Sequence, residues 1–330
     1  MQRREFIGLI GTAALSFPRP GYAQTKTDLP LVGVLYPGRA EMLKDRIAAL
    51  RLGLQEAGLI ERTNYSFAIR FADGDLSRVP SLAKELGDLK PTVLVIGSVA
   101  IPVHKILPEI PIVFTSFAVD PVALGLAQSY VHPGGMVTGN VMNAVGGEEA
   151  MAQKRMGLFK ELVPGLTRLG MISTTNNPLP AAEKNALQKV AGHLGFEFVH
   201  YPIQTVDDLE GAFASGLRDG VSAFYISGET LLITNMSRVM PFATASGKPT
   251  VGPYAEWARA GLLMSYSSDL SDGFRHAGTY VAKILSGTKP GDLPIEQASK
   301  FIFAINLKTA KVVGIAVPPT LLALADEVIE

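Results

Sequence analysis

The stretch PIVFTSFAVDPV, residues 111–122, holds the pattern that decides the fold. It begins as a buried β-strand, because residues 112–114 are apolar and mostly β-forming, and it becomes polar at Thr115 and Ser116. The pair Asp120-Pro121 closes the stretch, and such pairs often open a turn. A core strand that ends in this way either simply leaves the core or presents polar groups to a ligand, since ligands of α/β proteins bind beyond the carboxyl ends of strands.

Strands and helices alternate around this stretch. A helix is expected over residues 45–57, where apolar residues share one face and Gly58 stands at the position of a C-cap. A second helical pattern surrounds residues 82–89. The expected strands are residues 29–38, 65–71, 92–98 and 110–116. Such alternation predicts parallel βαβ units in a doubly wound sheet.

The same order of segments then occurs a second time. Strands are expected at residues 168–178, 196–203, 222–228 and 248–254, with a helix over residues 181–194 that ends at Gly195. Gly170 stands in the first of these strands about where Gly33 stands in the first half. Similar order at nearly constant spacing predicts two lobes of the same topology.

The last quarter of the chain breaks the alternation. Residues 261–270 lead into a helix with Phe274, Ala277, Val281 and Ile284 on one face, and residues 301–314 form a late strand and turn. A tail that returns to both lobes would join them by several crossings and permit a hinge. We expect residues 24–140 with about 265–300 to form the first lobe, and residues 141–264 with about 301–330 to form the second lobe and the hinge.

The N-terminus has the pattern of an export signal. Arg3-Arg4 is a twin-arginine pair, a short apolar run follows over residues 6–17, and small residues precede Gln24. As a helix this run would reach about 18 Å, too short for a hydrocarbon core of about 30 Å. We therefore expect a signal peptide over residues 1–23. It has the twin-arginine pattern, although the Sec route stays open. The mature protein is expected to be exported to the periplasm, soluble and not inserted in the membrane.

The composition limits the classes of function. The 330 residues contain 30 Lys plus Arg and 30 Asp plus Glu, so no excess of positive charge suggests nucleic acid. The chain has no cysteine, which excludes disulfides, thiol catalysis and a lipid anchor on cysteine. It also lacks a G-x-S-x-G elbow, a phosphate-binding loop and a G-x-G-x-x-G motif, and its five histidines show no metal-binding spacing. We expect neither catalysis nor a cofactor or metal.

Polar or aromatic residues follow nearly every expected strand. Because the carboxyl ends of parallel strands share one edge, two such edges that face each other would form a cleft for a small molecule. Each candidate could instead serve a turn or a helix cap, and Trp257 could equally belong to the core. The candidate ligand-binding residues at these strand ends are Tyr36, Ser98, Ser116, Asp120, Asn176, Asn177, Glu229, Tyr254 and Trp257.

Several segments along the chain together resemble a known family. They include RREFIGLIGTAA at the N-terminus, PIVFTSFAVDPVALGLAQSYVHPGGMVTG over residues 111–139 and KFIFAINLKTAKVVGIAVPPTLLALADEVIE over residues 300–330. The chain resembles the substrate-binding proteins of ABC transporters related to tryptophan- and tyrosine-uptake binding proteins. Met136 and the residues before Asp120 depart from the usual family pattern near the expected cleft.

The resemblance implies an α/β fold of the type I periplasmic binding proteins, with two Rossmann-like lobes, parallel sheets and a multi-strand hinge. It implies that Ser98, Ser116, Asp120 and Thr138 face the cleft from the first lobe and that Asn176, Asn177, Glu229 and Tyr254 face it from the second. The expected ligand is an amino acid or an aromatic carboxylate, with Asp120 or Glu229 bound to an ammonium group in the first case. The expected partners are a membrane permease and its ATPase, and the protein is expected to be a monomer. A sensor that presents its ligand to a membrane receptor is the alternative, and an α/β hydrolase is disfavoured by the missing nucleophile.

Overall fold

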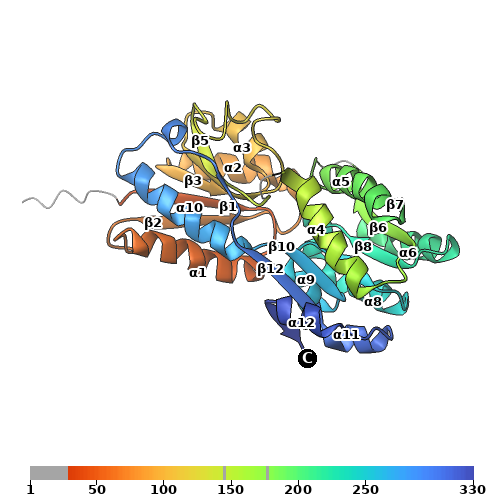
Figure 1. Ribbon diagram of the computed structural model, residues 1–330. Helices are drawn as coiled ribbons and strands as arrows, with labels where there is room; N and C mark the ends of the chain where they lie inside the picture. Colours follow the sequence, from red (N-terminus) through yellow and green to blue (C-terminus); the bar gives the residue numbers. More distant parts are fainter. Residues whose placement is uncertain (1–28, 144–145, 176–177) are drawn as a thin grey trace, which may run out of the picture.

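A computed structural model describes residues 29–143, 146–175 and 178–330. The expected signal peptide, residues 1–23, lies outside these ranges. The described chain forms two α/β lobes, each built around its own sheet (Figure 1). No helix in these ranges is long and apolar enough to cross a membrane.

The first sheet has six strands, all parallel to their neighbours, in the order β11-β5-β4-β3-β1-β2. Its strands are β1 Leu31–Tyr36, β2 Ser66–Phe71, β3 Val93–Ile96, β4 Ile112–Phe117, β5 Val137–Val141 and β11 Glu296–Gln297. Helices α1 (Ala40–Glu56) and α10 (Leu270–Leu285) pack on one face. On the other face lie α2 (Val79–Asp88), which follows the short helix η1 (Leu76–Arg78), and α3 (Ala100–Ile106).

The second sheet has seven strands in the order β13-β12-β10-β9-β8-β6-β7. Only the pair β10 and β12 is antiparallel among the strands described. Its strands are β6 Arg168–Thr174, β7 Glu197–Ile203, β8 Ala223–Ile226, β9 Thr250–Gly252, β10 Met264–Ser268, β12 Phe301–Asn306 and β13 Glu327–Ile329.

Helices also cover both faces of the second sheet. On one face lie α4 (Gly147–Leu162) and α5 (Pro178–Leu194), with α11 (Leu307–Val312) and α12 (Pro319–Leu324) beside them. The other face carries α6 (Leu209–Arg218) after the short helix η2 (Val206–Asp208), then α7 (Thr230–Thr234) and α8 (Met236–Ala245). The remaining helices are α9 (Ala255–Ala260) in the second lobe and η3 (Pro290–Asp292) near β11.

The two lobes repeat one topology, as the sequence predicts. The order β2-β1-β3-β4-β5 in the first sheet corresponds to β7-β6-β8-β9-β10 in the second. The tail also behaves as expected, since Phe274, Ala277, Val281 and Ile284 of α10 are buried. The expected α/β fold with two lobes and mostly parallel sheets is therefore confirmed.

The chain crosses between the sheets three times, after β5, after β10 and after β11. Strand β10 reaches Ser268 within the second sheet before α10 returns to the first. The expected lobe boundaries near residues 140, 265 and 300 stay a prediction, although these crossings fall close to them.

The first lobe depends on a close approach of α1 and α10. Apolar residues Leu43, Ile47, Leu50 and Leu54 form the buried stripe of α1. A Cβ atom at Gly53 would lie 1.9 Å from the carbonyl oxygen of Arg275, so only glycine permits this contact. The segment after β10 is thereby anchored to a helix near the start of the chain (Figure 1).

Candidate functional site

A cavity lies between the two lobes at the carboxyl ends of their strands. The space inside it, counted together with the part open to solvent, is about 630 Å³. The first lobe contributes Tyr36, Pro37, Gly38, Arg46, Gly97, Ser98, Thr115, Ser116, Ala118, Leu270 and Phe274 to its lining, and the second contributes Leu179, Gly228, Thr230, Ile233 and Tyr254.

Arg46 is the buried cation of this cavity. It projects from α1, is only 7% exposed, and donates one hydrogen bond to the hydroxyl of Tyr36 and another, of 2.7 Å, to Glu256 of α9. Burial opposes the positive charge, but Tyr36 and Glu256 outweigh it and hold the pKa of Arg46 above its ordinary value. Because α1 and α9 belong to different lobes, this ion pair bridges the cleft.

The end of β4 presents two hydroxyl groups. Thr115 is buried, and its hydroxyl has no hydrogen-bond partner in the described part of the chain. Ser116 adopts a left-handed backbone conformation with a φ of 47°, and its N–H donates to Oδ1 of Asn140 over 2.8 Å. Strained non-glycine residues often mark ligand sites, and here Asn140 supports the strained conformation.

Asn140 also joins this strand end to α10. Its Nδ2 donates to the carbonyl oxygen of Gly273 over 2.8 Å. A Cβ atom at Gly273 would lie 2.3 Å from Oγ of Ser116, so the helix passes directly against the serine. The position of Ser116 therefore depends on a helix that begins at a crossing between the lobes.

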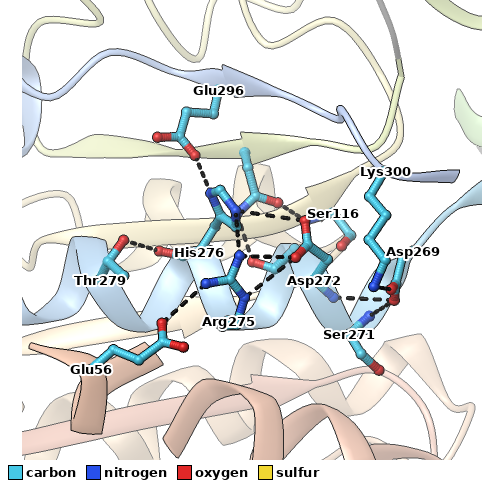
Figure 2. A network of polar contacts seen from close by, with 12 residues as sticks. Glu56, Ser116, Asp269, Ser271, Asp272, Arg275, His276, Thr279, Glu296 and Lys300 are labelled. Carbon is cyan, nitrogen blue, oxygen red and sulfur yellow. Dashed lines mark hydrogen bonds and ion pairs between the residues drawn. The ribbon is translucent and has the colours of Figure 1, made fainter. Parts of the chain in front are cut away.

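The crossings themselves carry a network of charged side chains (Figure 2). Asp269 caps α10 by accepting hydrogen bonds from Ser271 and Asp272, and its Oδ2 lies 2.8 Å from Nζ of Lys300 on the third crossing. His276 stands between two carboxylates, 2.6 Å from Glu296 and 3.6 Å from Asp272. These contacts hold the second and third crossings to each other and to the first lobe.

A second charged network lies behind the wall of the second lobe. Glu183 of α5 accepts hydrogen bonds from the hydroxyls of Tyr225 and Ser227 and from the N–H of Gly228, which lines the cavity. Burial, together with the charge of Glu148, raises the pKa of Glu183 to about 7. Arg155 joins the network through Tyr225 at 2.9 Å and Glu148 at 3.2 Å. The cavity wall at Gly228 is thus fixed by a buried carboxyl group.

The structure brings four of the ten candidate residues together. Tyr36, Ser98, Ser116 and Tyr254 all line the cavity. Burial raises the pKa of both tyrosines, so both side chains are neutral hydrogen-bonding groups. Asn176 and Asn177 lie outside the described residues.

Asp120 and Thr138 stand away from the cavity lining. Asp120 is exposed and accepts hydrogen bonds from the N–H groups of Val122 at 2.9 Å and Ala123 at 3.3 Å, which is the role of a turn residue. Thr138 is fully buried in β5 and donates to the carbonyl oxygen of Leu293 over 2.7 Å.

Glu229 and Trp257 also stand outside the lining. The carboxylate of Glu229 is buried and accepts hydrogen bonds from the N–H and hydroxyl of Thr174 at the end of β6. Trp257 is fully buried in the second lobe, where its ring packs against Gly252 at the end of β9. Both residues shape the second lobe, and neither reaches the cavity with the other candidates.

Three polar or charged lining residues, Arg46, Thr115 and Thr230, are absent from the candidates predicted from the sequence. Arg46 lies on a helix and not at a strand end, but it occupies a position within the apolar stripe between Leu43 and Leu50. A charged residue on an apolar helix face is a usable signal, because burial of a charge requires a partner. Thr115 belongs to the stretch over residues 111–122, but the sequence favours its neighbour Ser116 as the strand end.

The lining residues have the composition of a small-molecule site. No group of His, Asp and Glu side chains within residues 29–143, 146–175 and 178–330 has the geometry of a metal site. The lining combines a guanidinium, several hydroxyls and apolar side chains, which suits a small ligand with one polar end.

Comparisons with known proteins agree with the architecture. The crystal structure of an ABC domain in complex with L-Trp from Streptococcus pneumonia has a TM-score of 0.82 and 22% identity, covering 92% of this chain and all of that one. A conserved domain protein from Vibrio cholerae has a TM-score of 0.81 and 23% identity, covering 91% and 100%. A tyrosine-binding protein from Clostridioides difficile (strain R20291) is 25% identical over 260 residues, or 78% of this chain and 73% of the relative.

Two lobes of this topology, joined by three crossings, define the fold of the type I periplasmic binding proteins. The sequence profile of the ABC transporter substrate binding protein family matches residues 32–329. The chain belongs to this family, as the resemblance implied.

Proposed function

We propose that the protein is the solute-binding component of an ABC importer and traps a small ligand with a polar end and an apolar or aromatic body between its lobes. The cavity lined by side chains from both lobes is the observation that carries this proposal. Family membership supports it, as do a relative named for tyrosine binding and a fold neighbour solved with L-Trp.

Binding is coupled to closure of the two lobes about their three crossings. In the closed arrangement Arg46 and Glu256 join across the cleft, and the backbone at Gly74 of the first lobe lies close to Thr234 of the second. Opening would separate these contacts and expose the cavity. In this proposal the exported monomer in the periplasm delivers its ligand to a membrane permease with its ATPase and leaves the ligand chemically unchanged.

A thermal-shift screen of the purified protein tests the proposal. Amino acids, aromatic acids and small sugars would be added singly, and a ligand at about 100 times its dissociation constant adds about 2.7 kcal/mol to stability. We expect one chemical group of compounds to raise the melting temperature and to be recovered unchanged by mass spectrometry. A flat response over the whole library, or conversion of the ligand, would contradict the proposal.

A further inference from the structure

The cavity holds one charged side chain among its described lining residues, and that side chain is a cation. Arg46 lies within the wall, and its guanidinium has five N–H donors, of which Tyr36 and Glu256 each receive one described hydrogen bond. Glu256 is outside the lining, and its side chain is 30% exposed, so water screens it from the cavity more than it screens Arg46. The cavity therefore presents a guanidinium that is paired with Glu256 outside the lining and still has donors available.

No carboxylate lines the cavity in the described ranges. Asp120 caps a turn, and Glu229 is occupied by Thr174. Glu183 lies behind Gly228 and receives three hydrogen bonds there. The four internal residues outside the described ranges are Ala144, Val145, Asn176 and Asn177, and none of them is acidic.

Hydroxyl groups and apolar side chains make up most of the remaining lining. The buried Thr115 hydroxyl has no partner among described residues, and it lines the same cavity as Arg46. Leu179, Ile233 and Phe274 provide apolar surface, with Tyr254 beside them. A hydroxyl donor and a guanidinium suit a carboxylate, and apolar and aromatic walls suit a ring or a short alkyl body.

We infer that the ligand is a carboxylate with an apolar or aromatic body and no ammonium group. This inference rests on the proposed binding function and gives the chemical class of its ligand. An amino acid would place its ammonium in a cavity without a carboxylate partner, and an unpaired buried charge is strongly unfavourable. The site therefore binds such a carboxylate more tightly than the amino acid that carries the same ring or alkyl group.

Isothermal titration calorimetry with four compounds that share one ring tests the inference. The compounds are 3-(4-hydroxyphenyl)propanoate, its uncharged amide, L-tyrosine and tyramine, and the series is repeated with phenyl and indolyl rings. We expect a propanoate to bind about tenfold or more tightly than the corresponding amino acid, and the amines not to bind.

Arg46→Gln identifies the source of the preference. The variant should remove most of the preference for the propanoate over its amide, although it also loses the contact with Glu256 and lowers both affinities. Arg51→Gln is the matched control, because Arg51 lies on the same helix and pairs at the surface with Glu61. It should leave the preference unchanged, and circular dichroism would verify that both variants are folded.

The outcomes separate this inference from the function on which it rests. Equal or tighter binding of the amino acids would overturn the inference and leave the binding function intact. Binding of only a sugar or another uncharged solute would do the same. Failure of every compound in the broader library would overturn both.

Discussion

The ion pair between Arg46 and Glu256 should stabilise the closed arrangement of the ligand-free protein. The two side chains belong to different lobes, and their N–O distance is 2.7 Å. Glu256→Gln removes the negative charge and leaves Arg46 buried with a weaker partner. Hydrogen bonds between charged groups contribute about 1.5–3 kcal/mol, and the partial exposure of Glu256 reduces this to about 1–2 kcal/mol. In the open arrangement both groups would be in water, so the ratio of closed to open molecules should fall about 5–30-fold.

Distance measurements between spin labels would detect this shift. The chain has no cysteine, so cysteines introduced at Lys84 on α2 and Glu210 on α6 would label one exposed site on each lobe. Double electron–electron resonance of ligand-free Glu256→Gln should show a larger fraction of long distances than the parent protein.

A matched substitution controls for loss of charge. Glu327 pairs with Arg259 inside the second lobe, and its side chain is 29% exposed, against 30% for Glu256. Glu327→Gln should leave the distance distribution unchanged. If both variants gave the distribution of the parent protein, the ion pair would not contribute to closure and the reasoning would be refuted.

Three further predictions concern other parts of the molecule. The pKa of Glu183 is about 7 in the folded protein and about 4.5 in the unfolded chain, so the folded protein holds a proton that the unfolded chain has lost. The free energy of unfolding should therefore fall by about 3 kcal/mol as pH rises from about 4.5 to about 7. In denaturant unfolding at pH 5 and pH 8, Glu183→Gln should lose that decline, and an unchanged decline would contradict the assignment. Gly53→Ala should destabilise the protein by about 3 kcal/mol, because the new Cβ meets the carbonyl oxygen of Arg275. Gly157→Ala on α4 is the control, because its Cβ enters open space and should not destabilise the protein. Equal melting temperatures of the two variants would contradict the close packing of α1 against α10. Thr115→Val should keep stability within about 1 kcal/mol but weaken ligand binding about fivefold, and unchanged affinity in calorimetry would remove Thr115 from the site.

The repeated α/β pattern of the chain was predictable because its signals are local. Eight strands of the two lobes appear as β-forming runs between helical patterns, and β1 to β4 correspond in order to β6 to β9. Strand β5, with the sequence VTGNV, escaped recognition because three of its five residues are polar or glycine. Its polar groups are satisfied by distant partners, such as Leu293 for Thr138 and Gly273 for Asn140, which no local pattern reveals.

The candidate site was predictable only where the rule of strand ends applies. Tyr36 and Ser116 lie within the last two residues of β1 and β4, and Tyr254 follows β9; all three reach the cavity. Trp257 also follows β9, but it turns into the core. Whether a residue at a strand end faces the cavity or its own lobe depends on the backbone direction of the loop. Arg46 escaped prediction because its role arises from a lobe more than two hundred residues away in the chain.

A crystal structure of the protein with the tightest-binding compound of the calorimetric series would test the central claim most directly. We expect the compound to lie between the lobes in contact with Arg46, Thr115 and Tyr254, with its carboxylate toward the guanidinium. A ligand bound on the outer surface of either lobe, with this cavity empty, would contradict the account.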